Sequence, residues 1–294
     1  MKKVKLLLLP LLLSLITIGC AQNRADRPFL EERVEAKGYL YIEGGTYIGD
    51  MPEYMLQKFL SLVGDREKRV VVIPFAGRNL EEFAQKGDLF KNRVLELGAQ
   101  SAHVIVCEKE EVDSPENLKL LESANIVFFT GGQQAKLADW MLNTKLLESV
   151  KRIYSQGGVV GGSSAGASIM GRLMPSGTVV GPDDPPNKLL QVAKGTITLG
   201  EGFGFLQNII VHQHYLARKR THRLFSALLD YPNLRGVGID EKTAIIVKPN
   251  STFEVIGESK VLVFEPYDLS LKAGGEGDSF IVRILSEGDS YNFK

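Results

Sequence analysis

The feature that most constrains the fold is a glycine- and serine-rich segment, GGVVGGSSAGAS, at residues 157–168. Val159 and Val160 are typical of the end of a buried strand, and the run from Gly162 to Gly166 fits the G-x-S-x-G pattern of a nucleophile elbow. Glycines flank the serine in such a turn because a Cβ would collide with neighbouring backbone. The pattern predicts a strand, a tight turn bearing Ser164 and a helix beginning at Ala165, and it indicates a hydrolase. A glycine-rich phosphate loop is the alternative interpretation.

From residue 38 onward, apolar segments alternate with helical ones. Continuous apolar runs such as VVVIPF and NIVFFT indicate strands covered on both faces. The alternation predicts an α/β fold with a mostly parallel, doubly wound sheet flanked by helices. The predicted strands are Gly38–Ile42, Arg69–Phe75, Ser101–Val106, Ile126–Thr130, Val159–Gly161, Asn208–Val211, Val237–Ile239 and Ala244–Val247. The predicted helices are Pro52–Val63, Asn79–Leu97, Pro115–Ser123, Gln134–Asn143, Lys145–Gln156 and Thr221–Leu229, and Ser251–Lys294 is predicted to form hairpins at the sheet edge.

The N-terminus has the pattern of a targeting segment. Three lysines precede an apolar run that ends at Ile18, which is shorter than the roughly 20 residues that a spanning helix needs. The sequence TIGC that follows resembles a bacterial lipoprotein signal with Cys20 as the acylated residue, and an ordinary cleaved secretory signal is the alternative. Several acyl chains would anchor the protein stably to a bacterial membrane, in the periplasm or at the cell surface. We expect a signal peptide over residues 1–19, a polar tether over 20–37 and one α/β domain over 38–294.

Composition and charge exclude some classes of function. The 294 residues are 44% hydrophobic and 24% charged, which is typical of a globular protein with one large core. The formal net charge is zero, and it becomes about −3 without the three lysines of residues 1–19. No basic excess therefore favours nucleic-acid binding. If Cys20 is lipidated, Cys107 is left alone without a disulfide, and we expect it at the end of a buried strand rather than as a nucleophile.

Polar or glycine-rich residues follow four of the predicted strands. Gly131-Gly132-Gln133-Gln134, the Ser164 turn, His212-Gln213-His214 and Asp240-Glu241 each come directly after an apolar run. Open parallel sheets bind ligands at the carboxyl ends of their strands, so these segments are expected to converge on one site.

A serine nucleophile needs a base and an acid that orients the base. His214 is the predicted base, because it follows a strand and imidazole transfers protons near neutral pH. Glu241 is the predicted acid, with Asp183 and Asp184 as alternatives in the loop after the elbow. The order Ser–His–Glu differs from the order in α/β-hydrolases, but geometry rather than order defines a triad.

Two further features lie at the same strand ends. The backbone N–H groups of Ala165 and of Gly131 or Gly132 are the predicted oxyanion hole. His212 and His214 are two residues apart on an extended segment, so both can face one side, as metal ligands do. No acidic or cysteine ligand has a recognisable local spacing to them, and we expect neither a metal nor a cofactor.

The segment RKRTHR at residues 218–223 carries five side chains that can be cationic, and it opens a predicted helix. A solvated helix face is one interpretation. The alternative is substrate binding, because arginines bind carboxylates through paired hydrogen bonds and an anion would offset the unfavourable placement of cations at a helix start.

Four motifs in this order, TGGQQ, GGSSAGAS, HQHYLARKRTHRL and GVGIDEKTA, resemble those of the family of cyanophycinase and peptidase E, the aspartyl dipeptidase. The resemblance spans roughly Gly38–Val263. It implies a serine peptidase on a class I glutamine-amidotransferase-like fold, a homodimer, and a triad of Ser164, His214 and Glu241. It also implies four substrate-binding residues: Gln134, Arg218, Arg220 and Arg223.

The sequence departs from the family pattern at three places. His212 and Gln133 stand where the family usually has aspartate, and Pro182–Pro186 lies in a loop unlike the usual one. Cyanophycinase releases β-Asp-Arg dipeptides, and loss of two carboxylates weakens the case for an arginine-bearing substrate. We therefore expect an exopeptidase-like hydrolase of acidic, Asp-containing peptides, with β-aspartyl linkages among the candidates. A peptide-binding surface lipoprotein without turnover is the alternative; an amidotransferase is disfavoured because that class usually has cysteine at the elbow.

Overall fold

The computed structural model describes residues 36–179, 192–267 and 279–294. The chain divides into two units, Met1–Arg33 and Val34–Lys294, and every described residue belongs to the second unit. The expected signal peptide, Cys20, nearly all of the tether, Asp183, Asp184 and Pro182–Pro186 lie outside the described residues. Among the helices that are described, none is both long and apolar enough to cross a membrane.

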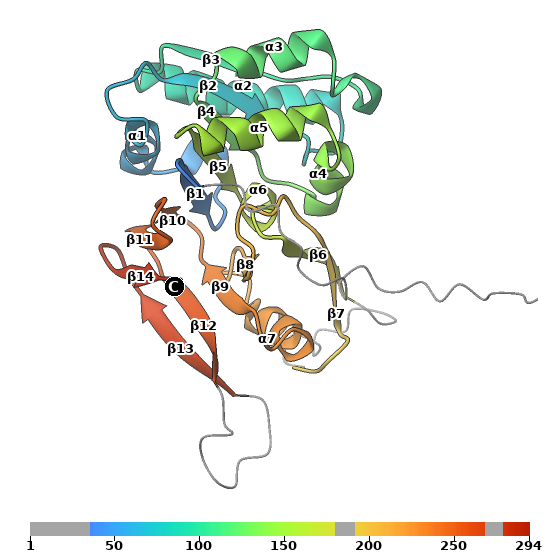
Figure 1. Ribbon diagram of the computed structural model, residues 1–294, viewed down its shortest axis with the longest axis vertical. Helices are drawn as coiled ribbons and strands as arrows, with labels where there is room; N and C mark the ends of the chain where they lie inside the picture. Colours follow the sequence, from blue (N-terminus) through green and yellow to red (C-terminus); the bar gives the residue numbers. More distant parts are fainter. Residues whose placement is uncertain (1–35, 180–191, 268–278) are drawn as a thin grey trace, which may run out of the picture. The chain divides into compact units, whose positions relative to one another are not determined.

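The main sheet has eight strands in the order β14-β11-β10-β1-β5-β4-β2-β3 (Figure 1). Its parallel core consists of β1 (Tyr39–Glu43), β2 (Arg69–Ile73), β3 (Ser101–Val104), β4 (Ile126–Phe129) and β5 (Val159–Ser163). Three antiparallel strands extend it beyond β1: β10 (Thr243–Val247), β11 (Thr252–Gly257) and β14 (Ser290–Asn292). The mostly parallel α/β class predicted from the sequence is confirmed.

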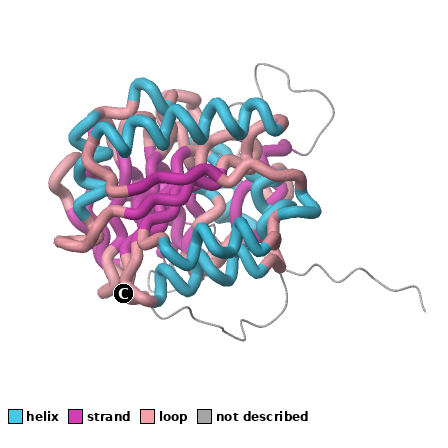
Figure 2. Tube along the Cα trace, turned by 90° about the horizontal axis from the view of Figure 1, so that it is seen from above, coloured by secondary structure: helices cyan, strands magenta, loops and turns pink. Residues whose placement is uncertain are grey.

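Helices cover both faces of this sheet, as Figure 2 shows. Alternate residues of the strands enter two separate cores, so that Val70 and Val72 pack on one face while Val71 and Ile73 pack on the other. The first core includes residues of α1 (Glu53–Ser61) and the second half of α2 (Leu80–Glu96). The other includes residues of α3 (Pro115–Ser123), α4 (Gln134–Met141) and α5 (Lys145–Ser155). Burial on both faces explains the continuous apolar runs in these strands.

A second sheet carries the segments in which the base and the acid were predicted. Its order is β13-β12-β9-β8, and β8 (Ile209–His212) runs parallel to β9 (Arg235–Ile239), with α7 (Thr221–Asp230) connecting them (Figure 1). β12 (Val261–Tyr267) and β13 (Ser279–Leu285) complete it as an antiparallel hairpin. β10 occupies the edge of β1, so β9 pairs with β8 and β12 instead of joining the main sheet.

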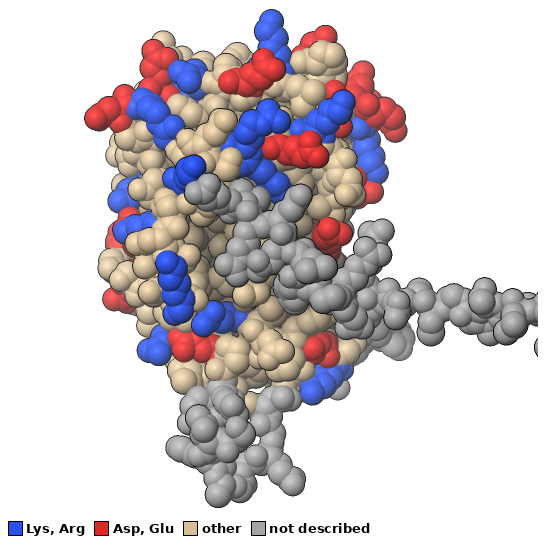
Figure 3. All heavy atoms as spheres, in the orientation of Figure 1, with Lys and Arg blue, Asp and Glu red and all other residues tan. Residues whose placement is uncertain are grey.

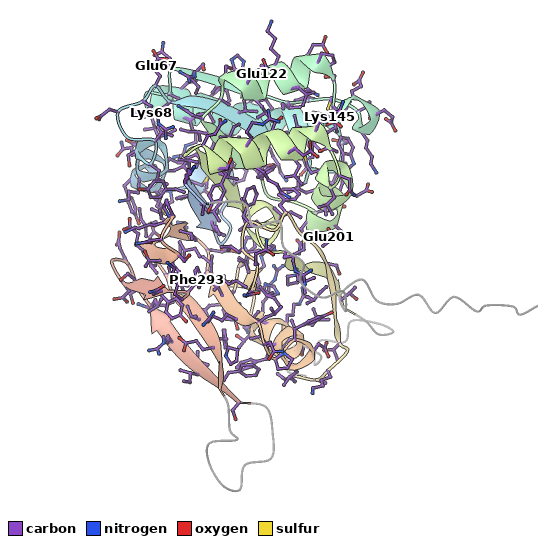
Figure 4. All side chains as sticks on the ribbon, viewed as in Figure 1. Glu67, Lys68, Glu122, Lys145, Glu201 and Phe293 are labelled. Atoms are coloured by element: carbon purple, nitrogen blue, oxygen red, sulfur yellow. The ribbon has the colours of Figure 1, made fainter. Side chains whose placement is uncertain are left out.

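The C-terminal segment is shared between the two sheets. β11 and β14 extend the main sheet, whereas β12 and β13 belong to the second. Near the end of the chain, the ring of Phe293 (Figure 4) lies 5.1 Å from that of Phe253 in β11. A further pair, β6 (Leu173–Val179) and β7 (Ile197–Glu201), was not predicted, because Pro175 and Gly177 interrupt any strand-like pattern in β6.

Candidate active site

Close packing of backbone forms the turn that bears Ser164. β5 ends at Ser163 and the short helix α6 (Ala165–Ser168) follows, ending two residues before the expected Met170. Ser164 has φ +53° and ψ −107°, a conformation that a side chain disfavours. A Cβ on Gly162 would lie 2.3 Å from the Gly166 carbonyl oxygen, and one on Gly166 would lie 2.2 Å from that of Phe129. Only glycine therefore fits at positions 162 and 166 without a steric clash.

His214 lies between Ser164 and Glu241. Its Nε2 is 2.9 Å from Ser164 Oγ, and its Nδ1 is 2.6 Å from Glu241 Oε1. A carboxylate can only accept, so Nδ1–H donates to Glu241 and Nε2 is left to accept the Ser164 hydroxyl proton. Burial lowers the pKa of His214 to about 4, against the opposing effect of Glu241. The imidazole is therefore neutral at neutral pH and can take a proton.

The backbone after β1 fixes the position of this imidazole. The N–H of His214 donates to the Gly44 carbonyl oxygen at 2.6 Å, and Ser164 N–H donates to that of Glu43 at 3.0 Å. Gly45 has φ +119°, and a Cβ there would lie 2.2 Å from His214 Cε1. The imidazole thus packs directly on the backbone of Gly45, a contact that no sequence motif indicates.

Asp240, which directly precedes Glu241, hydrogen-bonds to the turn after His214 and to Ser259. Its Oδ1 accepts the N–H groups of Leu216 at 3.0 Å and Ala217 at 2.8 Å, and its Oδ2 accepts the Ser259 hydroxyl at 2.7 Å. Asp240 therefore holds the turn that follows His214. No sequence motif indicates this role, because the partners are two backbone amides and a serine hydroxyl that is distant in the sequence.

The predicted oxyanion-hole residues lie beside the serine. A Cβ on Gly131 would be 3.0 Å from Ser164 Cβ, so this glycine faces the nucleophile closely. Lys86 Nζ donates to the Gly131 carbonyl oxygen at 2.9 Å and fixes that peptide. Within the described residues, the N–H groups of Gly131, Gly132 and Ala165 donate no hydrogen bond, which leaves them available to a ligand.

A pocket of about 410 Å³ opens in front of Ser164. Among the described residues that line it, three are arginines and none is acidic; they include Gln133, Gln134, Ile197, His212, Gln213, Arg218, Arg220 and Arg223. All four predicted substrate-binding residues therefore line one pocket. On the face that Figure 3 shows, by contrast, basic and acidic side chains intermingle around the helices of the main sheet.

The arginines of the pocket repel one another. Burial lowers the pKa of Arg220 to about 10, and the charges of Arg223 and Arg218 contribute. Arg220 donates to the side-chain oxygen of Gln213, Arg218 Nε lies 3.6 Å from Glu241 Oε1, and the buried Nε of Arg223 has no partner among the described residues. Such a cluster favours an anionic ligand.

The remaining polar side chains of the pocket differ in how they are held. Gln134 Nε2 donates to the Pro175 carbonyl oxygen at 2.5 Å, so this amide also anchors β6. His212 is buried, and burial followed by the charge of Arg220 lowers its pKa to about 3. Its Nδ1 lies 3.3 Å from the Gln213 carbonyl oxygen, and its Nε2 has no partner in the described part of the chain.

Two other predicted features lie outside this arrangement. The described residues contain no cluster of three metal-ligating side chains, and His212 and His214 make separate contacts. β3 ends at Val104, so Cys107 follows in a loop rather than ending the strand. Burial raises the pKa of its thiol, which disfavours a reactive thiolate.

Comparison with known proteins identifies relatives of the whole domain. Residues 40–255 match a family model described as "Peptidase family S51". A cyanophycinase of Geminocystis herdmanii is 30% identical over 250 residues, which cover 82% of this chain and 88% of that protein. A cyanophycinase of Synechococcus elongatus is 28% identical over 268 residues, covering 88% and 80%.

Two solved structures share the fold. A peptidase from an acI-B1 Actinobacterium has a TM-score of 0.65 at 23% identity and covers 89% of this chain and 99% of that one. A putative peptidase E protein from Listeria monocytogenes has a TM-score of 0.51 at 16% identity and covers 76% and 99%.

Proposed function

The chain belongs to peptidase family S51 and is a serine-type peptidase related to cyanophycinases, and on that premise we propose that it hydrolyses Asp-containing peptides through an acyl-enzyme on Ser164. The observation that supports this proposal is the contact of His214 with Ser164 at 2.9 Å and with Glu241 at 2.6 Å, where Ser164 also lines a pocket with three arginines. An intact contact of this kind disfavours the alternative of a peptide-binding protein without turnover.

The proposed reaction has two halves. In the first, Ser164 Oγ attacks the scissile carbonyl carbon while His214 Nε2 takes the hydroxyl proton, and Glu241 stabilises the imidazolium. The N–H groups of Ala165 and of Gly131 or Gly132 hold the oxyanion. The imidazolium then protonates the leaving amine, and the C–N bond breaks. In the second half, water gives a proton to His214 Nε2 and attacks the ester carbonyl carbon. The imidazolium then returns that proton to Ser164 Oγ as the ester C–O bond breaks, and the carboxylic acid product leaves.

The pocket supports an acidic substrate. Arg218, Arg220 and Arg223 present guanidinium groups, and no described lining residue is an acid. A substrate carboxylate relieves the repulsion among these arginines, whereas a guanidinium on the substrate adds to it. We infer that the arginines bind aspartyl carboxylates, and that arginine-bearing substrates are hydrolysed less well than short acidic ones.

A substrate screen tests the proposal. The full-length chain and Ser164→Ala are given Asp-X and β-Asp-X peptides, the matched Asn-X peptides and the β-Asp-Arg polymer. We expect at least about 10-fold higher kcat/KM for acidic peptides than for Asn-X, a difference of about 1.4 kcal/mol, and no turnover by the variant. Equal activity of the two proteins would refute the mechanism, and equal rates on Asp-X and Asn-X would refute the specificity.

We also propose that the chain is exported and anchored to a bacterial membrane through acyl chains on Cys20, and that it forms a homodimer. Residues 1–20 support the anchor, and resemblance to the family supports the dimer. Metabolic labelling with an alkynyl fatty acid is expected to mark the full-length chain but not Cys20→Ala. Light scattering of Cys20→Ala in solution is expected to give twice the chain mass. Labelling of both proteins, or a monomeric mass, would contradict the respective statement.

A further inference from the structure

Glu43, the last residue of β1, is a buried carboxyl group for which the proposed reaction has no use. Only 1% of the residue is exposed. Burial, with the charge of Glu241 adding to it, raises the pKa of Glu43 to about 7 although hydroxyl groups donate hydrogen bonds to it. A buried ionisable side chain destabilises the fold relative to an apolar one. We therefore infer the role of Glu43 from the hydrogen bonds that it makes.

Thr46 connects Glu43 to the acid of the triad. The Thr46 hydroxyl donates to Glu43 Oε1 at 2.7 Å, and its own oxygen, Thr46 Oγ1, accepts the N–H of Lys242 at 2.9 Å. Lys242 directly follows Glu241 and is 196 positions away from Thr46 in the sequence. A chain of two hydrogen bonds therefore runs from a buried carboxyl to the backbone beside Glu241.

The backbone at Lys242 needs such support. Lys242 has φ +50°, a left-handed conformation that is unfavourable for a residue with a side chain. The other groups of this turn have separate partners: the Lys242 carbonyl accepts the Glu258 N–H at 2.9 Å, and the Glu241 carbonyl accepts the Thr243 hydroxyl at 3.1 Å. Thr46 is thus the partner of the N–H that follows the triad acid.

Burial does not orient the Glu241 carboxylate. Its side chain is 41% exposed, and Arg218, whose side chain is 54% exposed, competes for the same oxygen at 3.6 Å. The direction of this carboxylate toward His214 therefore depends on the backbone that carries it. A small rotation of the turn would move Oε1 toward Arg218 and solvent.

We propose that Thr46 and Glu43 are positioning residues: Glu43 orients the Thr46 hydroxyl, and that hydroxyl fixes the Lys242 backbone so that Glu241 meets His214. The role rests on the proposed function of the triad. It predicts that the Thr46 hydroxyl contributes to the rate of nucleophilic attack and not to substrate binding, because neither residue lines the pocket.

A matched pair of variants tests this role. Thr46→Val removes the hydroxyl at nearly constant volume, Thr46→Ser keeps it, and Thr46 is partly exposed, so both are expected to fold. Full-length proteins are treated with a fluorophosphonate, and the rate and the final stoichiometry of labelling are measured. Thr46→Val is expected to be labelled about 10-fold more slowly but to full stoichiometry, and Thr46→Ser at no less than half the wild-type rate. Turnover of an Asp-X peptide is expected to show the same loss in kcat, with KM within twofold.

A second variant distinguishes the role of Glu43 as a hydrogen-bond acceptor from the effect of its negative charge. Glu43→Gln keeps a carbonyl oxygen for the Thr46 hydroxyl, so its labelling rate is expected to stay within threefold of wild type. The proposal is overturned if Thr46→Val reacts at the wild-type rate, if the two Thr46 variants lose rate equally, or if the loss appears only in stoichiometry. Failure of the proposed function looks different: the wild type itself is not labelled, or Ser164→Ala is labelled equally.

Discussion

Ser164 follows strand β5 in a turn where close backbone packing leaves no room for a Cβ on the flanking glycines. His214 and Glu241, by contrast, lie on two turns that are held by hydrogen bonds from other parts of the chain. At the elbow, Cβ atoms on Gly162 and Gly166 would lie 2.3 and 2.2 Å from carbonyl oxygens. The two turns depend instead on Asp240, on Thr46 and on the carbonyl oxygen of Gly44.

The difference teaches that one site can combine two kinds of rigidity. Steric exclusion at the elbow is local and tolerates almost no substitution. Hydrogen bonds at the turns are individually weak, about 1 kcal/mol each, but they set the direction of His214 and Glu241, the proposed base and acid. Substitutions at the elbow are therefore expected to act first on folding, and substitutions at the turns on catalysis.

The largest expected effect is on the turn side. Glu241→Gln leaves the geometry nearly intact but favours the wrong imidazole tautomer, so kcat is expected to fall by about 10³- to 10⁴-fold. The thermal midpoint is expected to change little, because the Glu241 side chain is 41% exposed. Steady-state kinetics and a thermal scan measure both. A loss of less than 10-fold would mean that Glu241 is not the acid of a triad.

On the elbow side, Gly162→Ala places a methyl group 2.3 Å from the Gly166 carbonyl oxygen. The free energy of unfolding is expected to fall by about 3 kcal/mol, at the upper end for overpacking, because backbone cannot move aside easily. Gly200→Ala is the control, since its nearest neighbour would be Met174 Cε at 3.6 Å. Urea titrations of both proteins compare them, and equal losses would contradict a steric role for the elbow glycine.

The buried carboxyl group of Glu43, which bonds to the Thr46 hydroxyl, is expected to make the stability of the fold depend on pH. Burial raises the pKa of Glu43 from its ordinary value of 4.5 to about 7 in the fold, so the folded state retains a proton that the unfolded chain releases between these values. The stability that this retained proton supports is complete below about pH 4.5 and is lost as the pH rises through 7.

Relative to Glu43→Gln, the wild type is therefore expected to lose up to about 3 kcal/mol of unfolding free energy between pH 5 and pH 8. Urea titrations at the two pH values measure this difference. The buried histidines shift stability in both proteins alike, so their effect cancels in the comparison. A difference that stays constant with pH would contradict burial of an ionisable Glu43.

The smallest effect concerns the turn after His214. Asp240→Asn replaces charge-assisted hydrogen bonds to Leu216 and Ala217 with neutral ones, so a loss of about 1 kcal/mol in unfolding free energy and a several-fold drop in kcat are expected. Asp139→Asn is the control, because its ion pair with Lys109 is exposed and contributes little. If both variants behave alike, Asp240 does not hold the turn.

The same contrast explains what the sequence predicts well. The elbow is encoded by contiguous residues, since Gly162, Ser164 and Gly166 are two apart and their steric constraint is local. Apolar runs predicted the parallel strands because both of their faces are buried. His214 and Glu241 are predictable because each follows a strand. In the structure, His214 contacts Ser164 and Glu241 contacts His214.

Other parts of the site depend on contacts that the sequence does not encode locally. Thr46 accepts the Lys242 N–H across 196 positions, and Lys86 of α2 donates to Gly131 in the loop after β4. Neither residue has a motif around it. The second sheet was not predicted either, because strand order depends on which edge β10 occupies, and apolar patterns in β8 and β9 fit either sheet.

The most direct test of the account is the position of the fluorophosphonate adduct in the full-length chain, mapped by peptide mass spectrometry. The account predicts one adduct per chain, on Ser164, formed more slowly when an acidic dipeptide is present in excess and nearly abolished in His214→Ala. An adduct on another residue, or hydrolysis of Asp-X peptides by a chain whose Ser164 does not react, would contradict it.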